Sequence, residues 1–561
     1  MCIFAAILIN VSKVKKILSL FALLTMFSGL YAQVAPGRYW VQFSDKNNSP
    51  YSINRPEEFL SQRALDRRAK FNIAIDELDI PVNQAYIDAV AGCGAEILNP
   101  SKWLNGVTVR AVEPAVVEAI EELDFVVQVR GCNDNSTKQE IKDKFCFEKM
   151  SKSEIEIEAD SGYYGLAYEQ INQINGVAIH DAGYTGEGVL IGICDGGFAG
   201  ADNISLFAAA REEGRLLGTR DFVHGGTDVF NESAHGTAVW GLMGGKIENT
   251  YVGTAPDAMF FLCRTEDVGT ENVIEEYNWI SGVELLDSIG ADIMNSSLSY
   301  ITFDNPLMNH TYYEMDGQTA VITRGAEIAC SRGLLVVNSA GNEGNEQNVW
   351  RWMGAPADAE HVFTIGAVGV DGIRAPFSSI GPTYDDRIKP DVMGHGYNVY
   401  VAGSMEGWFG RGSGTSYSSP VICGMTACLM QAKPEKKPQE IMDCLKKSGN
   451  FSENPDSFYG FGVPDYVNAL NFLDVEEVEN DVSEFINIYP NPSNGVIFVE
   501  FGVEGDKNIQ VFNQLGRMIY NIDIQDDNSK IETFLTSLTS GVYVVKMTCY
   551  EKNISTKLIK N

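Results

Sequence analysis

Short apolar segments alternate with helix-like segments through the middle of the chain, and this alternation constrains the fold most strongly. The apolar segments end in polar or glycine-rich sequence: VLIGIC (189–194), MFFLC (259–263), DIMNSS (292–297) and GLLVVNSA (333–340). Helical stretches lie between them, as at 273–289 and 323–331. Strands that are apolar on both faces are typical of parallel sheets covered by helices on both sides. We therefore predict a three-layer α/β domain with its chemistry at the carboxyl ends of the strands.

The sequence changes character on both sides of this region, which we place at residues 161–474. Residues 33–132 alternate as strands and amphipathic helices of an α+β unit. Residues 133–160 are dense in Lys, Glu, Asp and Ser, which is typical of an exposed linker open to proteolysis. Residues 475–561 contain short alternating strands separated by turn signals, so we predict a small all-β sandwich there.

The N-terminus is typical of an export signal, which we assign to residues 1–32. Lys13, Lys15 and Lys16 precede the apolar run ILSLFALLTMF, and small residues follow it. An uncleaved anchor is the alternative. No later segment reaches ~18 consecutive apolar residues, so we expect no transmembrane span in the mature form. Export makes disulfides possible, and Cys93 and Cys132 are candidates to pair.

The charge balance limits the partners of the chain. Lys and Arg number 42 against 75 Asp and Glu, which gives a formal net charge of −33. Such a chain repels phosphate, so we expect no nucleic acid as a partner. Calcium is a possible structural ion, because acidic loops such as the one at Asp385 and Asp386 offer oxygen ligands. No metal ligand is assigned.

Three polar residues stand where such a sheet would place a site. Asp195 follows VLIGIC, His235 opens HGTAVWGLMGG, and Ser416 lies in GTSYSSPVICGM. A serine hydroxyl is a weak nucleophile until an imidazole takes its proton, and a carboxylate must orient that imidazole. Asn342, directly after the strand GLLVV, offers an amide for an oxyanion. Each residue alone is more often a cap or a turn residue, but the ordered set is specific.

The order Asp, His, Ser and the surrounding motifs resemble those of the subtilisin-like serine peptidases, the subtilases. The family's motifs stand here as CDGGF, HGTAV, SAGNEG and GTSYSSP. The segments at 377–392 and 459–470 also resemble family sequence. The resemblance implies a subtilisin-like fold over residues 161–474. It also implies that Ser416 is the nucleophile and that His235 is the general base and then the acid. Asp195 would orient His235, and Asn342 would form the oxyanion hole with the backbone N–H of Ser416.

The same resemblance implies a substrate groove. A peptide can pair as an added strand with an exposed edge, and 266–269 and 297–299 are the candidate edges. The predicted pocket walls are Ser297, Leu298, Ser299, Ser339, Ala340 and Gly341. Ser299 stands where the family has Gly, so we expect it to narrow the first specificity pocket. His395 stands where many members have Pro, and Trp240 replaces a small residue.

The flanking segments also resemble parts of secreted subtilases. Residues 33–132 resemble a subtilase propeptide, an inhibitor-like domain that would cap the groove, help folding and be removed by cleavage in the 133–160 linker. A permanent substrate-binding or docking domain is the alternative. Residues 475–561, with IYPNPSNGVIFVEF and LTSGVYVVKM, resemble the C-terminal sorting domain of type IX secretion cargo. A carbohydrate-binding or fibronectin-like sandwich is the alternative.

Together these features predict a secreted or cell-surface serine endopeptidase, made as a zymogen, that hydrolyses peptide bonds through an acyl-enzyme on Ser416. We expect polypeptide substrates, the type IX secretion machinery as the export partner, no required cofactor and a monomer. The alternative is a non-catalytic surface adhesin or binding module on a subtilase scaffold, which would need a broken triad. The cleavage specificity does not follow from these motifs.

Overall fold

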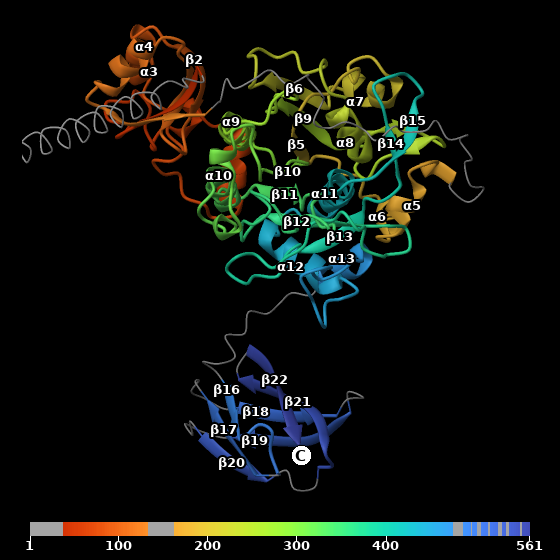
Figure 1. Cartoon of the computed structure of the whole chain (residues 1–561). Helices are drawn as coiled ribbons and strands as arrows, with labels where there is room; N and C mark the ends of the chain where they lie inside the picture. Colours follow the sequence, from red (N-terminus) through yellow and green to blue (C-terminus); the bar gives the residue numbers. More distant parts are fainter. Residues whose placement is uncertain are drawn as a thin grey trace, which may run out of the picture. The chain divides into compact units, whose positions relative to one another are not determined.

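The structure, a computed structural model, describes residues 37–132, 162–474 and most of 486–560 (Figure 1). Short gaps in the last segment fall at 495, 502–506, 514–516, 525–529, 535–537 and 550–551. The predicted export signal and the predicted linker lie outside the described residues. The chain divides into two compact units, 1–473 and 474–561, and each is described by itself.

Residues 37–132 form an α+β unit around an antiparallel sheet with the strand order β2-β3-β1-β4. Its elements are β1 (Arg38–Phe43), η1 (Pro56–Glu58), α2 (Gln62–Lys70), α3 (Gln84–Gly92), β2 (Glu96–Ser101), β3 (Gly106–Arg110), α4 (Pro114–Glu121) and β4 (Val126–Gly131). Side chains alternate along β1, so Tyr39, Val41 and Phe43 pack with α3 and α4. Trp40 points to the other face and stacks on Tyr277 of the central domain, with ring centroids 4.8 Å apart. The central domain therefore covers the second face of this sheet.

Seven strands form the central sheet in the order β13-β12-β11-β10-β5-β9-β6 (Figure 1). They are β5 (Leu190–Asp195), β6 (Leu216–Asp221), β9 (Met259–Arg264), β10 (Ile293–Ser296), β11 (Leu335–Ser339), β12 (Phe363–Val368) and β13 (Val392–His395). Every pairing between neighbouring strands is parallel, as predicted. The chain runs from β5 to β6 and β9 on one side and to β10 on the other. The strand order therefore reverses between β5 and β10, where such sheets place their ligands.

Helices cover both faces of this sheet, which confirms the predicted three layers. Ile191 and Ile193 of β5 pack on the face that carries α8 (His235–Gly244) and α11 (Thr415–Ala432). Leu190 and Cys194 pack on the opposite face with α9 (Ile274–Ile289) and α10 (Val321–Ser331). The smaller elements are η2 (Gly162–Tyr164), α5 (Tyr168–Asn172), α6 (Gly176–Asp181), η3 (Ser205–Phe207), α7 (Ala208–Glu212), β7 (Lys246–Ile247), β8 (Tyr251–Val252), η4 (Pro306–Met308), η5 (Tyr312–Glu314), β14 (Val399–Ala402), β15 (Phe409–Gly412), α12 (Pro438–Ser448) and α13 (Tyr466–Asp474).

Buried charges connect α2 to the central domain. The carboxylate of Asp287 on α9 is fully buried and accepts from Arg67, from Arg68 at 2.9 Å and from Lys102 at 3.1 Å. Burial by itself opposes ionisation of Asp287, but the cations of Lys102, Arg67 and Arg68 outweigh it and lower its pKa. The carboxylate of Glu284, one turn earlier on α9, accepts from the backbone N–H of Lys102 at 2.8 Å. The N-terminal α+β unit and the central domain therefore share one network of charged side chains.

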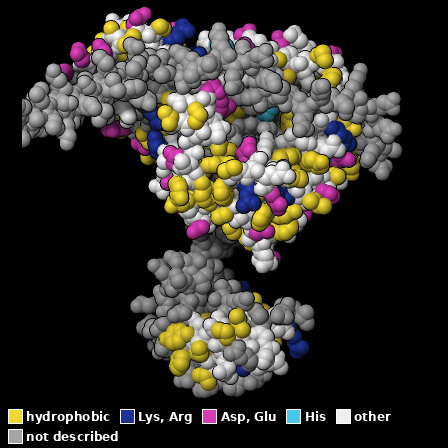
Figure 2. Space-filling model, viewed as in Figure 1, with side chains coloured by type: hydrophobic (Ala, Val, Ile, Leu, Met, Phe, Trp, Pro, Cys, Tyr) yellow, Lys and Arg dark blue, Asp and Glu magenta, His cyan; other side chains and the backbone are white. Residues whose placement is uncertain are grey.

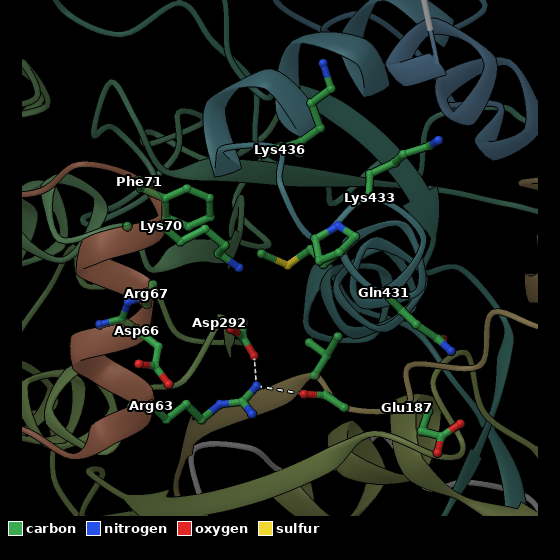
Figure 3. Close-up of a pocket in the computed structure, with 15 residues that line it drawn as sticks. Arg63, Asp66, Arg67, Lys70, Phe71, Glu187, Asp292, Gln431, Lys433 and Lys436 are labelled. Carbon is green, nitrogen blue, oxygen red and sulfur yellow. Dashed lines mark hydrogen bonds and ion pairs between the residues drawn. The ribbon is translucent and has the colours of Figure 1, made fainter.

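A cavity with a volume of ≈ 360 Å³ lies beside this network (Figure 3). Arg63 points from α2 across the cavity and forms an ion pair with Asp292, and it also donates to the backbone oxygen of Gly188. Both partners stand close to the amino ends of β5 and β10. This contact therefore lies at the edge of the sheet opposite to the carboxyl ends.

Cys93 and Cys132 do not form a disulfide; both thiols are free. Cys93 follows α3 and packs on the face of the N-terminal sheet that carries α3 and α4. Cys132 packs in the cluster on the other face, against the central domain. The pairing considered from the sequence is therefore wrong, because the sheet separates the two residues.

The second unit contains two antiparallel sheets. One has the order β16-β17-β20, with β16 (Ile486–Tyr489), β17 (Val496–Phe501) and β20 (Lys530–Phe534). The other has the order β19-β18-β21-β22, with β18 (Lys507–Phe512), β19 (Met518–Ile524), β21 (Gly541–Cys549) and β22 (Lys552–Lys560). Ile497 and Val499 of the first sheet share a hydrophobic core with Val511 and Met547 of the second. The unit is therefore a β-sandwich, as predicted.

The distribution of acidic side chains and the hydropathy of the helices relate to the predicted charge and to the predicted lack of a transmembrane span. Figure 2 shows Asp and Glu side chains dispersed over the visible face of the first unit. Among the helices that the structure describes, none combines the length and the hydropathy needed to cross a bilayer.

Candidate active site

Asp195 and His235 form a buried pair at the carboxyl edge of the central sheet. Asp195 is the last residue of β5, and His235 is the first residue of α8. The Nδ1 atom of His235 lies 2.9 and 3.0 Å from the two carboxylate oxygens of Asp195. Because a carboxylate can only accept, the proton sits on Nδ1, and Nε2 is left as the basic nitrogen. Asp195 is fully buried and His235 is 4% exposed, so water competes little for this contact.

The close approach of α8 to the end of β5 depends on Gly236. Its backbone N–H donates to the oxygen of Gly197 at 3.0 Å. A Cβ at Gly236 would lie 2.4 Å from the same oxygen, so no other residue fits. The glycine of the HGT motif therefore allows His235 to reach Asp195.

Ser416 lies in the first turn of α11, and a proline in the next turn removes one backbone hydrogen bond of this helix. Pro420 has no N–H, so it cannot bond to the carbonyl of Ser416 four residues earlier. The hydroxyl of Ser297 donates to that carbonyl instead, at 2.9 Å. The Oγ atom of Ser416 lies 3.4 Å from the backbone oxygen of Ser297. The segment that follows β10 is thus joined to the predicted nucleophile at two points.

The two helix starts come together beside this serine. The ring of Tyr417, the next residue of α11, lies 6.1 Å from the ring of His235 between centroids. Burial, with a smaller contribution from the charge of Asp195, raises the pKa of Tyr417. Tyr417 therefore stays neutral, and the start of α11 lies close to the start of α8.

The side-chain amide of Asn342 is oriented by Thr415. Its Oδ1 atom accepts from the backbone N–H of Thr415 at 2.9 Å and from the Thr415 hydroxyl at 3.0 Å. The same hydroxyl accepts from the backbone N–H of Gly341 at 3.1 Å. Because the oxygen is held in this way, the NH₂ group of Asn342 is available as a donor next to Ser416.

A cavity with a volume of ≈ 370 Å³ opens beside Ser416. Five of the six predicted wall residues line it: Ser297, Leu298, Ser299, Ser339 and Gly341. Asn342, Thr415 and Ser416 line it as well. Ala340, the sixth, lies outside the lining; it is fully buried, and its backbone N–H donates to Ile365 at 2.9 Å. The structure therefore brings the predicted nucleophile and most of the predicted pocket walls to one cavity.

Two residues that depart from the family pattern have structural roles. Trp240 on α8 is fully buried and stacks on Phe207, with ring centroids 3.8 Å apart. His395, the last residue of β13, is buried, its Nε2 atom lies 3.2 Å from the backbone oxygen of Tyr397, and burial lowers its pKa. Both side chains therefore pack inside the domain.

A group of carboxylates that the sequence motifs did not indicate lies beside the cavity, and two of them, Glu266 and Glu271, line it. Glu266, Glu271 and Glu275 each place one carboxylate oxygen within 4.8 Å of the others. Among the described residues this is a group whose geometry could hold a cation, and all-oxygen ligands suit hard cations such as calcium. The three residues share no sequence motif, so the sequence did not predict that they come together. It predicted only that 266–269 is a substrate edge.

Comparisons with known proteins account for the three parts of the chain. A model of the subtilase family matches residues 186–462. The central domain belongs to the subtilase family. A model of the Bacteroidota peptidase S8 propeptide domain matches residues 38–145, and a model of the secretion system C-terminal sorting domain matches residues 487–561. These matches confirm the resemblances seen in the sequence, including those of the two flanking segments.

Individual relatives are distant. Serine protease AprX of Bacillus subtilis (strain 168) is 27% identical over 316 residues, which are 51% of this chain and 66% of the relative. Subtilisin NAT of Bacillus subtilis subsp. natto is 28% identical over 296 residues, which are 52% of this chain and 68% of the relative. The chain thus spans about two thirds of the length of these two proteins. The crystal structure of MycP1 from Mycobacterium smegmatis has a TM-score of 0.44 and 20% identity, and the match covers 56% of this chain and 86% of that one.

The matches bear on activity and on export. The subtilase domain with its subtilisin relatives and the sorting domain support a secreted serine endopeptidase, and they do not favour the non-catalytic alternative. The sorting domain indicates secretion across the outer membrane to the cell surface or the extracellular space. Polypeptide substrates and the type IX secretion machinery follow as partner classes.

Proposed function

We propose that this protein is a secreted serine endopeptidase that cleaves polypeptides through an acyl-enzyme on Ser416. The observation that carries the proposal is the buried pair in which His235 Nδ1 contacts both oxygens of Asp195, next to the helix start that bears Ser416. A buried carboxylate that orients an imidazole beside a serine is the arrangement that activates a hydroxyl.

The steps follow from these positions. His235 Nε2 takes the proton of the Ser416 hydroxyl as Oγ attacks the carbonyl carbon of the substrate, and Asp195 stabilises the imidazolium. The negative oxygen that develops accepts from the NH₂ group of Asn342 and from the backbone N–H of Ser416, at the N-terminus of α11. His235 then returns the proton to the leaving amine. Water, activated by the same imidazole, hydrolyses the acyl-enzyme.

Reaction with a serine-directed fluorophosphonate tests this proposal. We expect stoichiometric labelling of the secreted mature protein at Ser416, because activation by His235 makes this hydroxyl more nucleophilic than the other serines. Peptide mapping by mass spectrometry locates the label. Labelling that is unchanged in His235→Ala, or that is found only at another serine, would contradict the assignment.

We further propose that residues 33–132 act as a removable propeptide, that cleavage falls in 133–160, and that the mature catalytic domain is 161–474 followed by the sorting domain at 475–561. The charge network at Asp287 supports this division, because it ties α2 to α9 before cleavage. Side chains supply all the chemistry, so we expect no cofactor. A structural calcium ion and a monomeric state remain predictions.

Asp287→Asn should destabilise the precursor by about 3–5 kcal/mol, because it leaves the cations of Arg67, Arg68 and Lys102 buried with one fewer negative charge. The lowered pKa of Asp287 means that its contribution is present above its unfolded pKa and is lost as the pH falls through the lower folded value. Urea unfolding of the uncleaved Ser416→Ala precursor measures both effects.

Glu96→Gln is the matched control for Asp287→Asn, because Glu96 belongs to an ion pair with Arg110 in which both side chains are more than half exposed. We expect little change in the unfolding midpoint for this variant. Equal loss in the two variants would contradict a specific role of the Asp287 network.

A further inference from the structure

Carboxylates dominate the charge of the cavity beside Ser416. Glu266, Glu271 and Glu343 line it, and no Lys or Arg is found among the described residues of its wall. Burial raises the pKa of Glu343. The remaining wall consists of small polar residues, aliphatic carbon and the aromatic residues Tyr300 and Trp350. A substrate side chain that enters this cavity therefore meets carboxylates, and among the described residues of the wall it meets no Lys or Arg.

Glu266 and Glu271 belong to a denser acidic group. Glu266 follows β9, Glu271 lies in the next loop, and Glu275 is in the first turn of α9, yet one oxygen of each lies within 4.8 Å of the others. Glu266 is 1% exposed and Glu275 is fully buried. Like charges at this distance repel strongly where water is scarce. The N-terminus of α9 offsets part of this charge, and a cation would offset more.

Tyr300 connects the acidic group to the predicted substrate edge. Its hydroxyl donates to Glu266. Burial, together with the charges of Glu266 and Glu275, raises the pKa of Tyr300 well above its usual value, so the hydroxyl stays protonated as a donor. Tyr300 directly follows 297–299, the segment that Ser297 joins to Ser416. The acidic group and the nucleophile are therefore attached to the same stretch of chain.

We propose that this cavity is a specificity pocket for a lysine or arginine side chain on the acyl side of the scissile bond. The inference rests on the proposed function, because it takes the peptide acylated on Ser416 as the ligand. A lysine or arginine fits this wall chemically: the charged end meets Glu266 and Glu271, and the stem or the cation packs on Trp350. The acyl side is assigned because Asn342 and Ser416, which would hold the scissile carbonyl, line the same cavity.

Peptide p-nitroanilides test the proposal, because their leaving group is constant and only acyl-side residues vary. Lys, Arg, Leu or Glu is placed at each acyl-side position in turn, and kcat/KM is measured per active site titrated with the fluorophosphonate. We expect one position at which Lys or Arg is preferred over Leu by about tenfold or more. In Glu271→Gln the ratio of kcat/KM for the basic substrate to kcat/KM for the Leu substrate should fall to about twofold or less.

Matched variants separate local charge from net charge. Glu360→Gln removes an exposed carboxylate before the amino end of β12, at the opposite edge of the sheet, and should keep the full preference. Glu266→Gln should lower the preference as Glu271→Gln does. A variant with Glu271→Gln that retains the wild-type ratio of basic to Leu substrates would overturn the proposal.

Two further outcomes are distinguishable. A protein that titrates with the reagent and cleaves casein but prefers no basic residue at any acyl-side position refutes the pocket and leaves the proposed function intact. A protein that neither titrates nor cleaves refutes the proposed function itself. The same assays in EDTA and in millimolar calcium ion are the last probe: a basic preference in EDTA supports the pocket, and a preference for no basic residue in either medium overturns it.

Discussion

Ser416→Ala should lower peptide hydrolysis by about 10⁶-fold. Alanine has no hydroxyl that His235 can deprotonate and that can form the acyl-enzyme. The residual rate would come from substrate binding and from the amide of Asn342. Hydrolysis of casein and of a p-nitroanilide peptide measures the loss. The same variant should accumulate as an uncleaved precursor if processing depends on its own activity, which intact mass reveals.

The control for this variant is Ser331→Ala, at the exposed C-terminal end of α10. It removes a hydroxyl of the same kind and should leave the rate unchanged. Wild-type cleavage by a purified Ser416→Ala protein would reject the acyl-enzyme and revive a non-catalytic role for the domain.

Asn342→Ala should reduce kcat by about 10²–10³-fold with little change in KM, because its NH₂ group would bind the oxygen only as negative charge develops. Asn342→Asp is the decisive companion. An aspartate keeps an oxygen that accepts from the backbone and hydroxyl of Thr415, but it replaces the NH₂ donor with a second oxygen and adds a negative charge. We therefore expect Asn342→Asp to lose at least as much kcat as Asn342→Ala.

The opposite order of the two variants would assign a different role to Asn342. If Asn342→Asp retained wild-type kcat while Asn342→Ala lost it, the residue would act by anchoring Thr415 at the start of α11. Fluorophosphonate labelling of Ser416 in both variants checks that the nucleophile remains activated by His235.

The chemistry of this site could be predicted from the sequence because each part of it is encoded locally. Asp195 ends a strand, His235 and Ser416 begin helices, and the glycines and the proline beside them are required by backbone geometry at those positions. Parallel strands bring such ends to one edge, so order and spacing sufficed to place these residues near one another. The β-sandwich of the second unit followed in the same way from its alternating strands and turns.

Contacts between distant segments could not be predicted in this way. The bond from Ser297 to the carbonyl of Ser416 spans 119 positions, and the Asp287 network spans 185 or more. The pairing of Cys93 with Cys132 failed for the same reason, since nothing in either local sequence says on which face of the sheet the thiol lies.

By itself, the sequence determined the class of the fold and the identity of the catalytic candidates, because periodicity and motif geometry are properties of short segments. The tertiary structure alone decided what surrounds them. Glu266, Glu271 and Glu275 come from a strand end, a loop and a helix, and only folding gathers their carboxylates, two of which line the cavity that contains Ser416. Charge at a pocket depends on distances through space, which the order of residues along a chain does not fix.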